Sequence, residues 1–391
     1  RKVFGLLMLL DKEEQDLFHA YLGSALFEQG EVMQRFLACW QSHFGAGEPS
    51  STDPTVEQLL AGSGLVPARF DKYCSALHKR LLDFFAWRAY MQDELTRLQL
   101  GLSILEARQA SRKEIEAMRS KMGGLVQEMP QSSQKLRLEM DFHWKEAEDR
   151  VHARETQNVW KENFHHLQVA TERYFVLQKL RLECAAANIR LIFNQPIEPQ
   201  EPEHLLVLPE MGWDEAASRL DALALSYWIT LQLYRSEDAN EQFLRLFAHL
   251  QAQAAGFEEQ ERRELYNYLL NYCLRRSNQG ELQFQRHSAA IYRELLDNGV
   301  VLRQGKLAPQ VMKNIVVIHC VVGELEWVEA FLEKFKDRLD GEPDPNMIKY
   351  NHAVLAFYRK ERKAIDLFKE VISQLKGDIF YELDSRTYLL K

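Results

Sequence analysis

Glutamate and histidine stand three residues apart at Glu162 and His165, inside a long stretch of helix-forming residues. Side chains at this spacing project from one face of a helix. In helical bundles, an E-x-x-H sequence supplies half of a carboxylate-bridged di-iron site, which also needs a second E-x-x-H and two more inward glutamates. No second E-x-x-H occurs in the predicted helices. The sequence therefore favours a structural or solvated pair over a metal site.

Histidine and cysteine side chains in the C-terminal part are predicted to be structural. His319 stands in the apolar stretch IVVIHCVV, where a buried, hydrogen-bonded histidine is expected rather than a ligand. Cys273 and Cys320 lie on apolar helix faces, whereas a reactive thiol needs a basic and accessible setting. The common phosphate-binding, dinucleotide-binding and serine-nucleophile motifs do not occur in the chain. We therefore predict no catalytic residue, no metal and no cofactor.

Basic and tyrosine side chains form a second pattern with possible chemistry, close to the predicted helix ends of the C-terminal part. Arginine and tyrosine often anchor protein interfaces, and arginine can hold a carboxylate through two parallel hydrogen bonds. This pattern predicts a groove for a protein or peptide of acidic character. Because cations also favour helix C-termini, a solvated turn is the competing interpretation. The candidate partner-binding residues are Arg275, Arg276, Tyr350, Tyr358, Arg359, Lys360, Arg362 and Lys363.

The composition is that of a folded, helix-rich chain. Of 391 residues, 46% are hydrophobic and 27% are charged, and only 11 prolines and 18 glycines interrupt the sequence. No apolar run approaches the roughly 20 residues that a membrane helix needs, so no membrane attachment is expected. The cysteines are widely spaced and form no CxxC, which indicates reduced thiols in a cytoplasmic protein. They are Cys39, Cys74, Cys184, Cys273 and Cys320.

Apolar residues recur three and four apart along most of the chain, which predicts an all-α protein. Asp11 and Glu14 have the form of a capping box at a helix start. The pair Gly123-Gly124 and the residue Pro130 are expected to interrupt the helical pattern. Residues 132–193 then contain no glycine or proline, and one helix of that length would measure about 90 Å. We therefore predict two antiparallel helices that turn near residues 151–160.

The predicted helices fall into four regions, separated mainly by breaks rich in proline and glycine. Residues 1–130 form an N-terminal helical region, and residues 131–193 form the long helical hairpin. Residues 194–212, which contain four prolines, form a linker. Residues 213–391 form a helical repeat domain, whose first helix is predicted from Asp214 to Tyr234.

Three segments of this repeat domain can be laid over one another. They read YNYLLNYC (266–273), KNIVVIHC (313–320) and YNHAVLAF (350–357), and each has asparagine as its second residue. A turn and a second amphipathic helix follow each segment, with Gly280 and Gly323 marking two of the turns. The period is irregular, but repeated helix pairs predict an α-solenoid.

Residues 350–371, and to a lesser degree 313–335, resemble tetratricopeptide-type repeats. Ala353 stands where a small residue lets paired helices approach, and Ala364 and Phe368 are similar to the small–aromatic pair of that motif. The turn between the helices is about one residue shorter than in the family, and no proline closes the unit. The resemblance covers at most 213–391. It implies a right-handed α-solenoid of TPR-like repeats, preceded here by a helical-bundle region, that binds proteins through a concave surface.

These patterns predict a non-enzymatic scaffold that binds a protein or peptide through a groove of the repeat domain. Nucleic-acid binding by a helical repeat is one alternative, although 57 acidic against 49 basic residues give a net charge of −8, which disfavours it. A helical arm of a larger protein is another, because the chain starts at Arg1 and ends at Lys391 in mid-pattern. The least favoured alternative is a metal-binding bundle at Glu162 and His165.

Overall fold

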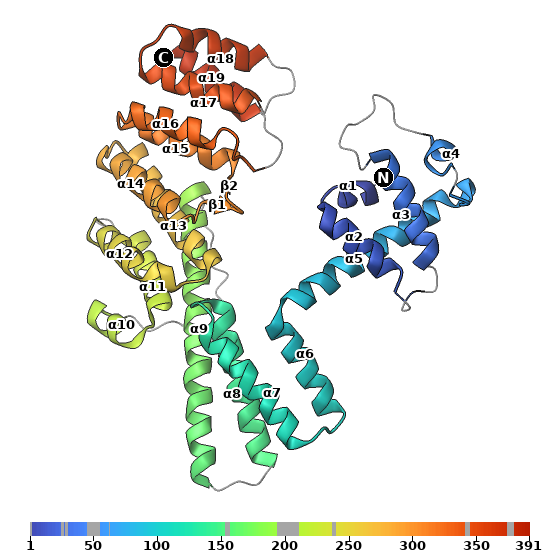
Figure 1. Ribbon diagram of the computed structural model, residues 1–391. Coiled ribbons are helices and arrows are strands. Elements are labelled where there is room, and N and C mark those ends of the chain that lie inside the picture. The colour runs from blue at the N-terminus through green and yellow to red at the C-terminus, as the bar shows by residue number, and fades with distance from the viewer. Residues whose placement is uncertain are drawn as a thin grey trace. The chain divides into compact units, whose positions relative to one another are not determined.

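The computed structural model confirms the prediction of an all-α protein. Within the described residues, nineteen α-helices account for nearly all regular structure, accompanied by two short 3-10 helices and one hairpin of two-residue strands. The chain divides into two compact units, Arg1–Gln127 and Glu128–Lys391 (Figure 1). In the described ranges, no helix combines the length and apolarity needed to cross a bilayer. Those ranges are 2–24, 27, 30–44, 55–61, 63–152, 157–193, 211–236, 240–340, 345–373 and 379–391.

The first unit has its own apolar core. Its fully buried side chains include Phe18 and Phe84, whose ring centroids lie 5.0 Å apart. The predicted capping box is confirmed, because the Glu14 N–H donates to the Asp11 carboxylate at 2.8 Å and the Asp11 N–H donates to Glu14 at 3.1 Å. The helices are α1 (Lys2–Leu7), α2 (Lys12–Leu22), α3 (Gly30–Phe44), α4 (Val56–Leu59), η1 (Pro67–Arg69), α5 (Phe70–Gln92), α6 (Glu94–Ala107) and α7 (Arg112–Glu128).

The predicted break at Gly123-Gly124 is wrong. Helix α7 runs through both glycines and ends at Glu128, two residues before Pro130. A glycine inside a helix costs about 1 kcal/mol but leaves every backbone hydrogen bond in place, whereas proline lacks the N–H donor. The proline therefore ends the helix, and the glycines do not.

The second unit begins with the long hairpin, as predicted. Helices α8 (Ser133–His152) and α9 (Gln157–Phe193) pack against each other, and residues 153–156 between them lie outside the described residues (Figure 1). The predicted linker, residues 194–212, also falls outside them except for its last two positions.

The hairpin shares its core with the helices that follow it. Leu177, Leu180 and Cys184 of α9 are fully buried among apolar residues of the next helices. The Cys184 thiol donates a hydrogen bond to the Tyr227 carbonyl at 3.1 Å. Those helices are α10 (Trp213–Arg219), α11 (Ala222–Arg235), α12 (Asn240–Gln253), η2 (Ala254–Gly256), α13 (Glu259–Asn278) and α14 (Gln283–Asp297). Residues 131–193 therefore pack as part of the same body as 213–300.

The single helix predicted from Asp214 to Tyr234 is wrong. The chain leaves the helix at Leu220, and Asp221 starts a new one by accepting a hydrogen bond from the Ala224 N–H at 2.9 Å. A carboxylate at this position satisfies a backbone donor that has no partner within its own helix. The aspartate therefore acts as a cap and separates α10 from α11.

The remainder of the unit has a second buried core, centred on residues such as Val316, Tyr350 and Phe368. Successive helices pair and stack in chain order, with α16 on α15 and α18 on α17, and α19 packs on both α17 and α18 (Figure 1). The elements are β1 (Leu302–Arg303), β2 (Lys306–Leu307), α15 (Pro309–Val321), α16 (Leu325–Phe335), α17 (Pro345–Tyr358), α18 (Lys363–Ser373) and α19 (Ile379–Leu390).

Three helices of this unit end in the same backbone turn. Gly280, Gly323 and Lys360 each have positive φ values, of 94°, 87° and 59°. In each turn the next residue is a glutamate, whose N–H donates to the carbonyl four residues before the left-handed position, at 2.9 to 3.1 Å. This 6→1 hydrogen bond is the Schellman motif, which closes a helix through a left-handed residue.

These turns place three asparagines at equivalent positions. Asn271, Asn314 and Asn351 each precede their left-handed residue, at 280, 323 and 360, by the same number of positions. The sequence comparison of the three segments instead predicts Asn267 as the counterpart of Asn314 and Asn351, and this prediction is wrong. Helix α13 continues one turn further than that alignment assumed, so the register moves by four residues.

Replacing Lys360 with glycine is expected to stabilise the protein by about 1 kcal/mol, because a side chain in the left-handed region costs roughly that much. Its side chain is exposed, so little packing is lost. Urea denaturation of the variant would measure the change. Gly323→Ala, which places a Cβ in the same conformation, should destabilise by a similar amount, and a shift of the same sign in both variants would contradict this account.

Candidate functional site

A groove of about 360 Å³ is lined by residues of α13, α14, α15, α17 and α19 and by Lys391. Leu270, Lys313 and Tyr350 line it from α13, α15 and α17, and they occupy equivalent positions relative to the turns at 280, 323 and 360. Asn271 and Asn314 form a second equivalent set in the same lining. Residues at equal distances before the three turns therefore line one groove from α13, α15 and α17.

Helix α19 closes one side of the groove and adds its polar groups. Asp384 accepts a hydrogen bond from the Tyr350 hydroxyl at 3.3 Å and forms an ion pair with Lys313. The Lys313 ammonium also lies 5.6 Å from the centre of the Tyr350 ring. Burial raises the pKa of Tyr350, with further contributions from Tyr388 and Asp384, so Tyr350 remains a neutral hydrogen-bond donor.

The accessible rim of the groove combines amide, ammonium and apolar groups. Asn314 and Lys391 are exposed, and Leu274 keeps 60% of its surface accessible. Lys313 and Lys391 outnumber the single carboxylate, Asp384, in the lining. The groove is therefore more positive than the chain as a whole, and it can offer both hydrogen bonds and apolar contact to a ligand.

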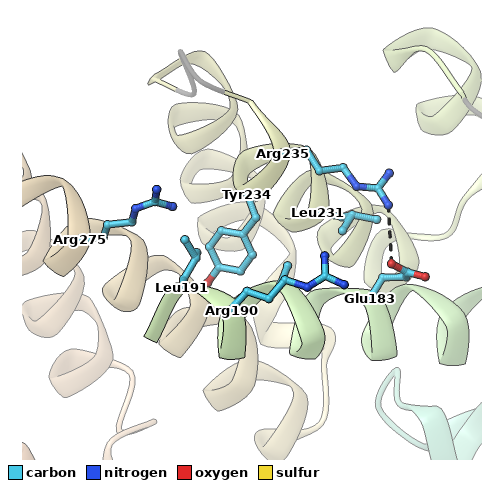
Figure 2. A pocket seen from close by; sticks show the side chains of 8 residues that line it. Glu183, Arg190, Leu191, Leu231, Tyr234, Arg235 and Arg275 are labelled. Atoms are coloured by element: carbon cyan, nitrogen blue, oxygen red, sulfur yellow. Dashed lines mark ion pairs between the residues drawn. The ribbon is translucent and has the colours of Figure 1, made fainter. Parts of the chain in front are cut away.

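A second hollow, of about 250 Å³, lies at the ends of α9, α11 and α13. Figure 2 shows Arg190 and Arg235 on one side of Tyr234 and Arg275 on the other. The Tyr234 hydroxyl lies 3.2 Å from Asn188 Oδ1 and donates to the Tyr268 carbonyl at 2.9 Å. Its ring is therefore fixed as part of the wall between the arginines.

The structure separates the eight candidate residues predicted from the sequence. Tyr350 lies in the groove as a buried part of its floor, and Arg275 lines the second hollow instead. Arg276 pairs with Glu281 across the α13–α14 turn at 2.6 Å and lies against the rings of Tyr272 and Phe284. These contacts indicate that Arg276 stabilises the turn between α13 and α14.

The basic run after α17 lines neither hollow. Arg359 pairs with Glu329 of α16 at 2.6 Å, and Lys363 pairs with Glu361 at 2.6 Å. Lys360 takes the left-handed turn position, and Arg362 is exposed. This arrangement matches the competing interpretation of a solvated turn at a helix end.

Tyr358 also lies outside the groove lining. Its ring is half-buried, with its centroid 5.4 Å from that of Phe357 and 6.5 Å from that of Tyr388. It supports Tyr388, which does line the groove. Its contacts are therefore those of a residue beneath the groove wall.

The alternative metal site was predicted at Glu162 and His165, and the structure describes the side chain of only one of these two residues. His165 is exposed on α9, and the side chain of Glu162 lies outside the described residues. His166 and His143 face each other with ring centroids 5.7 Å apart, and His143 lies 3.3 Å from Glu146. Within the described ranges, no three His, Cys, Asp or Glu side chains are grouped closely enough to hold a metal ion.

The histidine and thiols that were predicted to be structural are buried. His319 is fully buried, contacts the Ile315 carbonyl at 2.8 Å through Nδ1 and stacks on Trp327 with a centroid separation of 4.0 Å. Burial raises the pKa of Cys273 and that of Cys320 to about 12 each. A thiol with so high a pKa is almost entirely protonated at neutral pH and a poor nucleophile.

Sequence reasoning missed Lys313, Asp384 and Tyr388 as groove residues. Lys313 directly precedes Asn314 in the repeated segment, and that position could have been compared between repeats. Asp384 and Tyr388 belong to α19, which no repeated segment includes, so the sequence carried no signal for them.

Searches of protein-family models, curated proteins and solved structures found no match to this chain.

Proposed function

We propose that the chain is a binding scaffold whose repeat domain holds an acidic peptide, or an acidic segment of a partner protein, in the groove lined by α13, α14, α15, α17 and α19. On this proposal the stacked helix pairs form an α-solenoid of tetratricopeptide type, and the first helix of each pair presents its side chains to the partner. On this proposal the chain acts by binding and carries out no catalysis itself.

The observation that carries the proposal is the equivalence of the groove residues. Positions 270, 313 and 350, and positions 271 and 314, line the same groove, and the members of each set lie at the same distance before the Schellman turn of their helix. A binding surface built from equivalent positions extends along the stack and suits an extended peptide. A cavity formed by unrelated loops would suit a compact ligand better.

The chemistry of the lining indicates the kind of peptide. The exposed Asn314 side chain can exchange hydrogen bonds with a peptide backbone, and exposed Leu274 can contact an apolar side chain. Two lysines, Lys313 and Lys391, against the one carboxylate of Asp384 leave the lining with a net positive charge, which favours an acidic ligand. A preformed surface of this kind also loses little entropy when a ligand binds.

The test is selection from a random peptide library on the full-length chain. The selected peptides should be enriched in aspartate and glutamate beside apolar residues, and they should lose binding as salt is added, because exposed charges are screened. Selection of basic peptides, or selection unchanged by Asn314→Ala, would contradict the proposal. The matched control is Gln253→Ala, which removes an exposed amide on α12, a helix that contributes no residue to the groove lining.

A further inference from the structure

We propose that the hollow at Arg190, Arg235 and Arg275 is a binding site for a doubly charged oxyanion of the phosphate-monoester class. This site is separate from the groove, and its existence does not depend on the proposed peptide function.

Three helices bring the arginines together. Arg190, Arg235 and Arg275 occupy the last turns of α9, α11 and α13, and all three side chains are exposed at the hollow (Figure 2). Because the helices come from different parts of the sequence, the cluster exists only in the folded protein.

The charges around the hollow do not cancel. Glu183 is the one carboxylate in the lining, and it is shared between Arg235 at 3.7 Å and Lys179 at 3.1 Å. In the described part of the chain, Arg190 and Arg275 form no ion pair. Each helix C-terminus contributes about half a negative charge. The three lining arginines, together with Lys179, which pairs with Glu183 from outside the lining, exceed these negative charges by about one and a half units, in a chain of net charge −8.

The size and shape of the hollow fit a small group. About 250 Å³ accommodates a phosphate group and a few waters, whereas a folded domain cannot enter it. Guanidinium groups hold phosphate oxygens through paired hydrogen bonds, and a phosphate monoester carries between one and a half and two negative charges at neutral pH. Leu191 and Leu231 provide an apolar wall for the carbon atoms that carry such a group.

The Tyr234 ring, which lies between the arginines, is held by hydrogen bonds. This favours a site of fixed geometry over nonspecific attraction of anions. Asn188 Oδ1 lies 3.2 Å from the Tyr234 hydroxyl, and it accepts a hydrogen bond from the Asn271 amide at 3.0 Å. Tyr234 is therefore held between α9 and α13, and the arginines lie on either side of an ordered ring (Figure 2).

The experiment is calorimetric titration of the full chain with inorganic phosphate in low salt. Saturable binding is expected, stronger at pH 8 than at pH 6 because the second ionisation of phosphate lies between them. The double substitution Arg190→Gln and Arg275→Gln should weaken binding about tenfold or more. Arg286→Gln, an exposed arginine of α14 that lines neither hollow, should leave it within about twofold.

Two further ligands, O-phosphoserine and succinate, identify the source of the anion and can overturn the proposal. Tighter binding of O-phosphoserine than of inorganic phosphate supports a phosphorylated peptide, and equal binding supports a free phosphate. Succinate binding as tightly as either would overturn the phosphate assignment. Absence of saturable phosphate binding would overturn the site itself. So would a loss of phosphate affinity in Arg286→Gln as large as that in the double variant. Unchanged denaturation midpoints confirm that the variants are folded.

Discussion

Replacement of Glu261 by alanine is expected to lower the free energy of unfolding of the second unit by about 3 to 5 kcal/mol. Glu261 is 2% exposed and accepts hydrogen bonds from the Tyr227 hydroxyl at 2.6 Å and from the Ser133 N–H at 3.0 Å. It also lies 3.4 Å from Arg181. The substitution leaves buried donors from α8 and α11 without an acceptor, which is costly because water cannot replace it.

The loss should appear in urea denaturation and be localised by hydrogen exchange to α8, α9, α11 and α13. Glu259→Ala provides the control, because Glu259 begins the same helix, is largely exposed and pairs with Arg263 one turn away. Such a surface pair contributes about 0.5 kcal/mol. Equal midpoints for the two variants would show that Glu261 does not join the hairpin to the repeat domain.

Replacement of Phe368 by alanine is expected to destabilise the second unit by about 3 to 5 kcal/mol, the usual cost of emptying a buried aromatic site. Phe368 is 1% exposed, and its ring stacks on Tyr388 with a centroid separation of 5.1 Å and an interplanar angle of 6°. It also packs against Tyr350, 6.3 Å away. Because both tyrosines line the groove, peptide binding should weaken together with stability.

A phenylalanine on the neighbouring helix provides the control for this variant. Phe380 of α19 is 66% exposed, so Phe380→Ala should change the free energy of unfolding by no more than about 0.5 kcal/mol. Guanidinium denaturation measures the free energy of unfolding of the Phe368→Ala and Phe380→Ala variants. If the Phe368 variant unfolds at the same concentration as the Phe380 variant, the packing described for α17, α18 and α19 is incorrect.

Local features of the fold could be predicted from the sequence because the residues that determine them are close together. Asp11 and Glu14 cap a helix across three positions, and Gly280 and Gly323 mark helix ends through their own backbone conformation. The division of residues 132–193 into two helices followed from length alone. The Lys360 turn was harder to recognise, because a lysine occupies the left-handed position that Gly280 and Gly323 occupy in the other two turns.

The candidate sites depend on residues far apart in the chain, and periodicity does not report such contacts. Lys313 pairs with Asp384 of α19, and the arginine hollow needs α9, α11 and α13 to end at one place. The basic residues of 359–363 were conspicuous in sequence because they are adjacent. That adjacency reflects a turn, whereas the groove residues are separated by whole helix pairs.

The central claim is that equivalent positions of successive first helices form one binding surface for an acidic peptide. The most direct measurement is the fluorescence anisotropy of a labelled acidic peptide from the library, titrated with wild-type chain and with three variants. Lys313→Gln and Asn314→Ala change neighbouring groove positions, and Lys306→Gln removes an exposed lysine of β2 outside the groove. The account predicts an affinity loss of about tenfold for each groove variant and less than about twofold for Lys306→Gln. Unchanged affinity in both groove variants, with folding intact, would contradict it.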